Sequence, residues 1–201
     1  MPSLRDEAKS LYDREVDPIV VSLFSGSYFL PEIQRLFSEN IAAIRSRYGT
    51  DALYLIDDYQ IHHVNEVGFS TFRCGVQNSC PQIVILAANL KLAFDQIAKS
   101  KSKDCLELFR LHVVVSLMHE LDHLATGLVG NQGDPVREFE NERLTWARTC
   151  ENTMRLLVER YNKELYKSEL AYYSTWVKCG RNPESEEWKE FIATLYSPQQ
   201  K

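Results

Sequence analysis

The sequence lacks any apolar run long enough to cross a membrane. The longest runs, "PIVV" and "HVVVSLM", fall far short of the roughly 20 residues that a spanning helix needs. The first residues, "MPSLRDEAKSLYDRE", are charged and contain no continuous apolar segment of the kind found in secretory signals. These absences predict a soluble, cytoplasmic protein with no membrane partner.

A surplus of positive charge is also missing. The 201 residues carry a net charge of −5, and acidic and basic residues are interspersed along the chain. No cluster of Lys and Arg forms the stripe that a nucleic-acid surface requires. Nucleic acid is therefore excluded as the expected partner.

Cysteine is present in an odd number and in no Cys-x-x-Cys pair. The five cysteines suit reduced thiols better than a disulfide framework. One alternative stays open, because Cys74 and Cys80 flank a turn in "RCGVQNSC" and would be able to pair if the protein were exported.

The length and the hydrophobic content of 44% fit one globular domain over residues 1–201. Its fold class is predicted as α+β, with a lobe of helices and a small, mostly antiparallel sheet in residues 1–100 and an active-site helix with a helical lobe in 101–201. Apolar periodicity, caps and turn residues predict the elements. The expected helices are 4–15, 17–24 with Asp17 as its cap, 31–49, 89–101, 104–127, 134–165 and one or two more up to 196; the expected strands are 51–58, 59–66, 67–75 and 81–88.

The segment "SLMHELDHLATG" carries the chemistry. On a helix, His119 and His123 project from one face about 6 Å apart, so both can present a ring nitrogen to one zinc ion. Glu120 is rotated by about 100°, which lets its carboxylate reach a water activated by the ion. The pattern predicts a catalytic Zn²⁺ site with Glu120 as general base. Two surface histidines making local contacts are the ordinary alternative, and a di-iron bundle fails because it needs Glu-x-x-His twice.

A catalytic zinc needs a third protein ligand. His112 lies about 10.5 Å from His119 along the same helix, which is too far to share the ion. His62 and His63 belong to an expected strand and remain candidates. The richer source is the helix "REFENERLTWAR", in which Glu140 and Glu142 flank the predicted buried stripe by about 80° on either side and Glu138 lies further off. Solvated charges in a helix's first turns are the alternative for all three glutamates.

"HELDH" followed by "FENERLTWA" resembles the zincin metallopeptidases of the gluzincin type. In that family, a Glu-x-Glu-Ala-Asp/Asn-x-aromatic-Ala helix supplies the third ligand from its first Glu. The resemblance implies a peptide or protein substrate and makes Glu140 the metal ligand, because Trp146 and Ala147 then match the aromatic residue and the alanine. In the alternative register Glu138 comes first and Glu142 takes the supporting position. The family also implies that an edge strand pairs with the substrate, here "PQIVILAAN".

Asp122 supports a rival interpretation. "HELDHLATG" is similar to the His-Glu-x-Asp-His-Leu-x-Gly of peptide deformylases, which implies an amidohydrolase with an upstream cysteine ligand, and Cys74 is the candidate. A catalytically inactive zincin-like interaction module is a third hypothesis. Peptide hydrolysis would also need a donor for the developing oxyanion, for which Tyr172, Tyr173 or a strand histidine are candidates.

Overall fold

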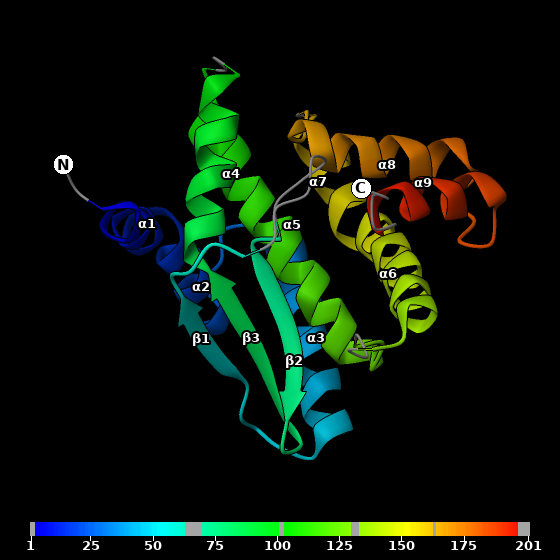
Figure 1. Ribbon diagram of the computed structural model, residues 1–201, viewed down its shortest axis with the longest axis horizontal. Helices are drawn as coiled ribbons and strands as arrows, with labels where there is room; N and C mark the ends of the chain where they lie inside the picture. The colour runs from blue at the N-terminus through cyan, green and yellow to red at the C-terminus, as the bar shows by residue number, and fades with distance from the viewer. Residues whose placement is uncertain (1–2, 63–69, 101–102, 130–132, 163, 197–201) are drawn as a thin grey trace.

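The computed structural model describes residues 3–62, 70–100, 103–129, 133–162 and 164–196 of the chain. A three-stranded sheet with its covering helices stands on one side, and a group of C-terminal helices stands on the other (Figure 1). Helix α5 (Cys105–Thr126) runs between them. The predicted α+β class is confirmed.

The chain begins with one continuous helix. It consists of α1 (Leu4–Leu11), a π-helical turn (η1, Tyr12–Val16) and α2 (Asp17–Phe24). The prediction that Asp17 caps a second helix was wrong, since the backbone is already helical at Val16 and no side chain caps α2. Pro18 has no N–H and its ring crowds the carbonyl four residues earlier, and the wider π turn just before it accommodates both effects.

Helix α3 (Pro31–Tyr48) agrees with its prediction. Pro31 occupies the first turn, and Gly49 ends the helix with a φ of 62°, a left-handed conformation that glycine adopts without strain. Its buried residues Ile33, Phe37 and Ile44 join the core, and the helix packs against α5. Helix α3 therefore covers one side of α5.

The sheet contains β1 (Tyr54–Asp58), β2 (Phe72–Gln77) and β3 (Cys80–Leu86) in the order β1-β3-β2. The β2–β3 hairpin turns at Asn78 and Ser79, whose φ values of 50° and 63° are those of a type I′ turn. Strand β1 pairs with β3 in parallel, so the sheet is mixed rather than mostly antiparallel. Residues 59–62 form no strand, and the rest of the strand expected at 59–66 lies outside the described residues.

The strand expected at the sheet edge proves to be central. β3 pairs with both neighbours, and its inward residues Ile83 and Ile85 are fully buried. The edge of the sheet that contacts α5 is formed by β2. After Leu86 the chain turns directly into α4 (Ala87–Lys99), which packs on α1 and α5. An apolar strand of this kind gains most from the middle of a sheet, where its neighbours cover both edges.

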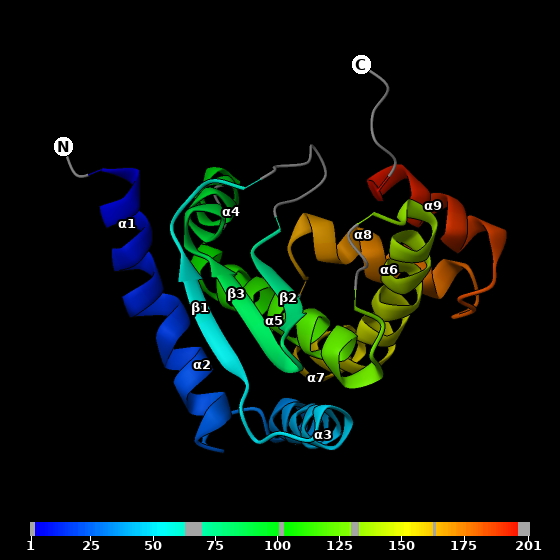
Figure 2. The ribbon, with the colours of Figure 1, turned by 60° about the horizontal axis from the view of Figure 1, so that its bottom comes forward.

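Helix α5 is the centre of the molecule. Fourteen of its 22 residues are buried, because it contacts α3, α4, β2 and α6 around its circumference. A helix that is covered on all sides carries apolar residues all round, which explains the run "HVVVSLM". Figure 2 shows α5 between β2 on one side and α6 on the other.

The C-terminal part follows the predictions closely. Helix α6 (Pro135–Thr149) continues through a π-helical segment (η2, Cys150–Met154) into α7 (Arg155–Tyr161). The long helix thus ends at Tyr161, before the expected residue 165, because Asn162 takes a left-handed conformation. Two further helices, α8 (Lys167–Lys178) and α9 (Glu186–Tyr196), cover it, and Trp188 of α9 is fully buried.

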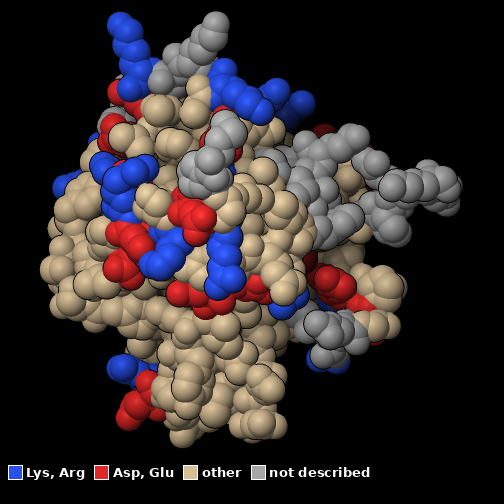
Figure 3. Space-filling model, turned by 60° about the vertical axis from the view of Figure 1, so that its left-hand side comes forward, with Lys and Arg blue, Asp and Glu red and all other residues tan. Residues whose placement is uncertain are grey.

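Three expectations from composition concern the molecule as a whole. Among the described helices, none combines the length and the apolarity that a membrane crossing requires. On the face drawn in Figure 3, acidic and basic side chains lie side by side between wide areas of other residues. All five cysteines are free, so Cys74 and Cys80 are not paired although the hairpin places them on adjacent strands.

Candidate metal centre

Two neighbouring turns of α5 present the histidines of the motif. His119 and His123 are 4% and 2% exposed, and their Nε2 atoms lie 3.1 Å apart. The four-residue spacing puts them on one helix face, as predicted, and that face is turned toward α6. The histidines are therefore part of the interior and not a surface pair.

Helix α6 supplies a carboxylate to the same point. Asp134 caps this helix by accepting the amide of Arg137, and Pro135 follows in the first turn. Two turns further on, one oxygen of Glu142 lies 3.2 Å from Nε2 of His119, and the other lies 3.2 Å from Nε2 of His123. These three residues form a group whose donor atoms all lie within 4.8 Å of one another.

The opposite ring nitrogens of both histidines are hydrogen-bonded to oxygen. Nδ1 of His123 lies 2.7 Å from the carbonyl of Leu128 and 3.1 Å from the hydroxyl of Thr145. Nδ1 of His119 lies 3.2 Å from the hydroxyl of Thr149. A carbonyl only accepts, so His123 keeps a proton on Nδ1, and its Nε2, which faces His119 and Glu142, is the nitrogen that can bind either a second proton or a metal.

The donor set fits a zinc ion. Ligand atoms about 2.0–2.1 Å from a tetrahedral zinc lie about 3.3 Å from one another. The two Nε2 atoms are 3.1 Å apart, and each lies 3.2 Å from a different oxygen of Glu142. Two Nε2 lone pairs at this distance repel unless a proton or a metal cation lies between them. The chemistry of the group therefore calls for a cation, and two imidazoles with one carboxylate are ligands that zinc takes.

In the metal-free cluster, a proton on His123 supplies the positive charge between the ring nitrogens and the carboxylate. Burial alone would lower the pKa of His123, but the Glu142 carboxylate outweighs burial and raises that pKa to about 9. Burial likewise would raise the pKa of Glu142, yet the two histidines hold it well below its usual range. Glu142 is thus an anion and His123 a cation at neutral pH, and a metal that binds here must displace a proton.

Glu120 lies on the neighbouring face of α5, toward the sheet. Its Oε2 accepts a 2.8 Å hydrogen bond from the backbone amide of Cys74 on β2. This bond fixes the carboxylate beside the cluster without making it a ligand. Burial, followed by the charge of Glu120, raises the pKa of the Cys74 thiol far above its usual range, which opposes the thiolate that a cysteine ligand would require.

An aromatic stack lies against the cluster. The ring of Trp146 stacks on His119 with centroids 3.9 Å apart, and Tyr172 stacks on the other face of Trp146 at 3.8 Å. Trp146 also donates from Nε1 to the hydroxyl of Tyr196, which in turn donates to Glu142 at 2.9 Å. Burial and the Glu142 charge raise the pKa of Tyr196, so its phenol keeps the proton that it donates.

Glu140, the glutamate preferred from the sequence, does not lie with the two histidines, whereas Glu142 does. Glu140 is 44% exposed in its side chain and pairs with Arg143 at 2.6 Å, while Glu138 is exposed at the start of the helix. Arg143, which is buried, turns to Glu140, Glu184 and a backbone carbonyl. Trp146, the aromatic residue of the sequence match, does lie at the cluster. It stacks on His119 and is linked through Tyr196 to Glu142 rather than to Glu140.

The other expected residues lie apart from the cluster or play a different part in it. Cys74 contributes its amide, and its thiol is not among the donors gathered with His119. His62 bonds to Asp58 at 2.7 Å, and His63 lies outside the described residues. His112 contacts Glu169 of α8. It lies away from the cluster, as its distance from His119 along the helix predicts.

Three participants were not found from the sequence: Tyr196, Thr145 and Thr149. A signal for the threonines is present in α6 and η2, where Asn141, Thr145, Thr149 and Thr153 recur every fourth residue and all are buried. A polar row at this spacing marks the face that meets the polar side of another helix. Nothing in the local sequence indicates Tyr196, which arrives from α9 by tertiary packing.

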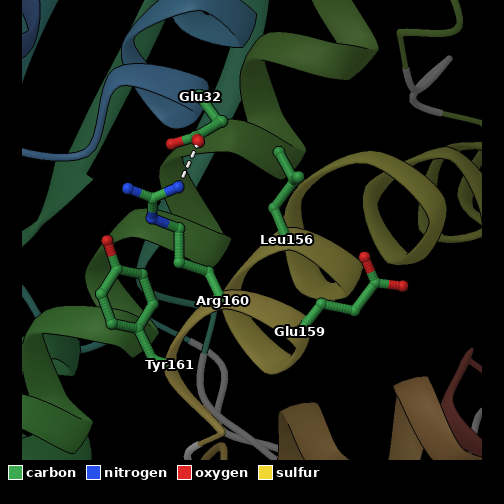
Figure 4. Close-up of a pocket in the computed structure, with 5 residues that line it drawn as sticks. All are labelled: Glu32, Leu156, Glu159, Arg160 and Tyr161. Carbon is green, nitrogen blue, oxygen red and sulfur yellow. Dashed lines mark hydrogen bonds and ion pairs between the residues drawn. The ribbon is translucent and has the colours of Figure 1, made fainter.

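A separate hollow of about 570 Å³ lies between α3 and α7 (Figure 4). Its lining includes Glu32, Leu156 and Tyr161, and Arg160 forms an ion pair with Glu32 at 2.6 Å. The charges of Glu32 and Arg160 in the lining are therefore paired with each other. The hollow shares no residue with the histidine cluster.

Comparison of the chain with models of protein families, with curated proteins and with solved structures gives no match. The functional argument therefore rests on the geometry of the cluster and on its chemistry.

Proposed function

We propose that this protein is a zinc-dependent metallopeptidase, with His119, His123 and Glu142 as the metal ligands and Glu120 as the general base. The observation that carries the proposal is that two buried Nε2 atoms on α5 lie 3.1 Å apart, and that each lies 3.2 Å from one of the two oxygens of Glu142 on α6. A structural zinc site closes with four protein ligands, whereas three leave a position for water. The gluzincin-like sequence pattern agrees with this ligand set once the second glutamate replaces the first.

Zinc bound at this centre would supply a Lewis acid that lowers the pKa of a water to around 7 and polarises a carbonyl group. Glu120 would accept the proton of the attacking water and later deliver it to the leaving nitrogen of the cleaved amide. The hydrogen bond from the Cys74 amide orients one carboxylate oxygen of Glu120. Tyr196 holds Glu142 in place and brings a phenolic donor to the same side of the cluster.

The substrate would lie along β2. The Cys74 amide points away from β3 toward Glu120, and among the described strands none pairs with this outer edge of β2, which lies beside the general base. An extended peptide can add to such an edge through main-chain hydrogen bonds. This placement favours a peptide or protein substrate over a small amide.

Four forms of the full chain test the proposal: wild type, Glu120→Gln, Glu142→Gln and Glu140→Gln. Each is measured for bound zinc by elemental analysis and for cleavage of a mixed peptide library. Wild type and Glu140→Gln should bind one zinc and cleave. Glu120→Gln should keep zinc and lose about 100- to 10,000-fold in rate, and Glu142→Gln should lose zinc as well.

Two outcomes would overturn the proposal at different points. Zinc that stays bound in Glu142→Gln would remove that residue from the ligand set. A zinc-loaded wild type that is as inert as Glu120→Gln on the library would refute the peptidase activity and favour a zincin-like interaction module instead.

A further inference from the structure

We infer that Asp122 is a positioning residue for the metal ligand His119 and acts on it through the hydroxyl of Thr149. This inference rests on the proposed metal centre and extends it to a residue that makes no contact with the donors themselves. Asp122 is 2% exposed, lies between the two histidines in sequence, and accepts the Thr149 hydroxyl at 3.0 Å. The same hydroxyl oxygen lies 3.2 Å from Nδ1 of His119.

The hydroxyl of Thr149 has one hydrogen and three neighbours. Two of them, the Asp122 carboxylate and the Thr145 carbonyl at 2.9 Å, can only accept. A charged acceptor makes the stronger bond, so the hydrogen goes to Asp122. The remaining lone pair of Thr149 must then accept from His119, which places the proton of His119 on Nδ1 and leaves Nε2 free for the metal.

The carboxylate of Asp122 is itself fixed from two other elements. Its Oδ1 accepts from Arg148 Nε at 3.0 Å and from the amide of Asn40 on α3, also at 3.0 Å. Nη2 of Arg148 in turn donates to the side-chain oxygen Oδ1 of Asn40 at 3.3 Å. The network ties α3, α5 and α6 together, and its Thr149 branch ends on His119.

His123 provides an internal control. Its Nδ1 bonds to the Leu128 carbonyl and to the Thr145 hydroxyl, and neither of these groups bonds to the Asp122 carboxylate, whose partners are Asn40, Arg148 and Thr149. Loss of the network should therefore change the hydrogen bond of one histidine and leave that of the other intact. A merely structural role of Asp122 would affect both histidines alike.

The experiment measures zinc affinity by chelator competition in the full chain and follows the histidine Nδ1 protons by ¹H–¹⁵N NMR in the zinc-loaded state. Thr149→Val and Asp122→Asn should each lower zinc affinity by about 10- to 100-fold, the range for lost partners of metal ligands. Thr149→Ser keeps the hydroxyl and should restore the affinity. The matched control is Thr153→Val, one turn further on, since the buried Thr153 hydroxyl has no hydrogen-bond partner among the described residues.

In Thr149→Val, the Nδ1 proton of His119 should exchange faster with solvent while that of His123 stays unchanged. The inference is overturned if either Thr149→Val or Asp122→Asn loses less than about fivefold in zinc affinity, or if both histidine signals change together. Failure of wild type to bind zinc would instead refute the metal centre. A zinc-binding but inert wild type would refute the peptidase while leaving this inference standing.

Discussion

Zinc binding should compete with a proton on His123, and the size of that competition follows from the structure. With a pKa of about 9 for His123, only about one molecule in a hundred has the ring neutral at pH 7, and about half have it at pH 9. Apparent zinc affinity should therefore rise about 50-fold between these pH values. At pH 7, binding should release about one proton per zinc.

The charge of Glu142 causes the raised pKa of His123. Two variants, Glu142→Gln and Glu140→Gln, therefore test the pH dependence as a matched pair. Replacing Glu142 by glutamine removes the charge that raises the pKa of His123, and the pKa then returns to or below its ordinary value near 6.5. Glu142→Gln should bind zinc far more weakly, and between pH 7 and 9 its residual affinity, measured at high zinc concentration, should change only about 1.3-fold. Glu140→Gln removes an equal charge that pairs with Arg143 away from the cluster, and it should keep the full dependence.

The assay is chelator competition at several pH values, combined with calorimetry in buffers of different ionisation enthalpy to count the protons released. A wild-type affinity that changes less than about threefold from pH 7 to 9 would contradict the coupling between His123 and Glu142. If the zinc affinity of Glu140→Gln were independent of pH, the charge coupled to His123 would be that of Glu140 and not that of Glu142.

Three further predictions follow from single contacts. In the metal-free protein, the raised pKa of His123 should add about 3 kcal/mol to the free energy of unfolding below about pH 6.5, and this contribution should be lost as the pH rises through about 9. Urea unfolding of wild type and Glu142→Gln at several pH values measures the contribution, and the same pH dependence of stability in both proteins would contradict it. Gly127→Ala should cost about 1–2 kcal/mol from its φ of 74° and more from Arg47, whose Nη1 lies 2.6 Å from the added Cβ and whose Nε bonds the Ala125 carbonyl. Gly26→Ala has the same kind of backbone with open space around it and should show the backbone cost alone in thermal melts. Cobalt binding should quench the emission of Trp146, because its ring stacks 3.9 Å from His119; Trp146→Phe should abolish most of the quenching and Trp176→Phe should not.

The local sequence determined those features that depend on neighbouring residues. Helix spacing alone put His119 and His123 on one face and kept His112 apart, because the geometry of a helix is the same in every fold. The stop at Gly49 and the turn at Asn78 and Ser79 are likewise local, since they need only a left-handed backbone conformation. The apolar run before the motif also predicted correctly that the helix is buried.

Tertiary structure decided everything that requires knowing which faces meet. Glu140 and Glu142 were equivalent on a helical wheel, and the choice between them came from the rotation of α6 against α5, which buries the Thr145 and Thr149 face. Strand order likewise depends on tertiary contacts: β3 is central because it pairs in parallel with β1 as well as with β2, and turn residues do not encode the contact with β1. The sequence by itself therefore determined two of the proposed ligands and the candidate base, since one helix carries them. The third ligand and the partners that orient the histidines required the packing of helices distant in the chain.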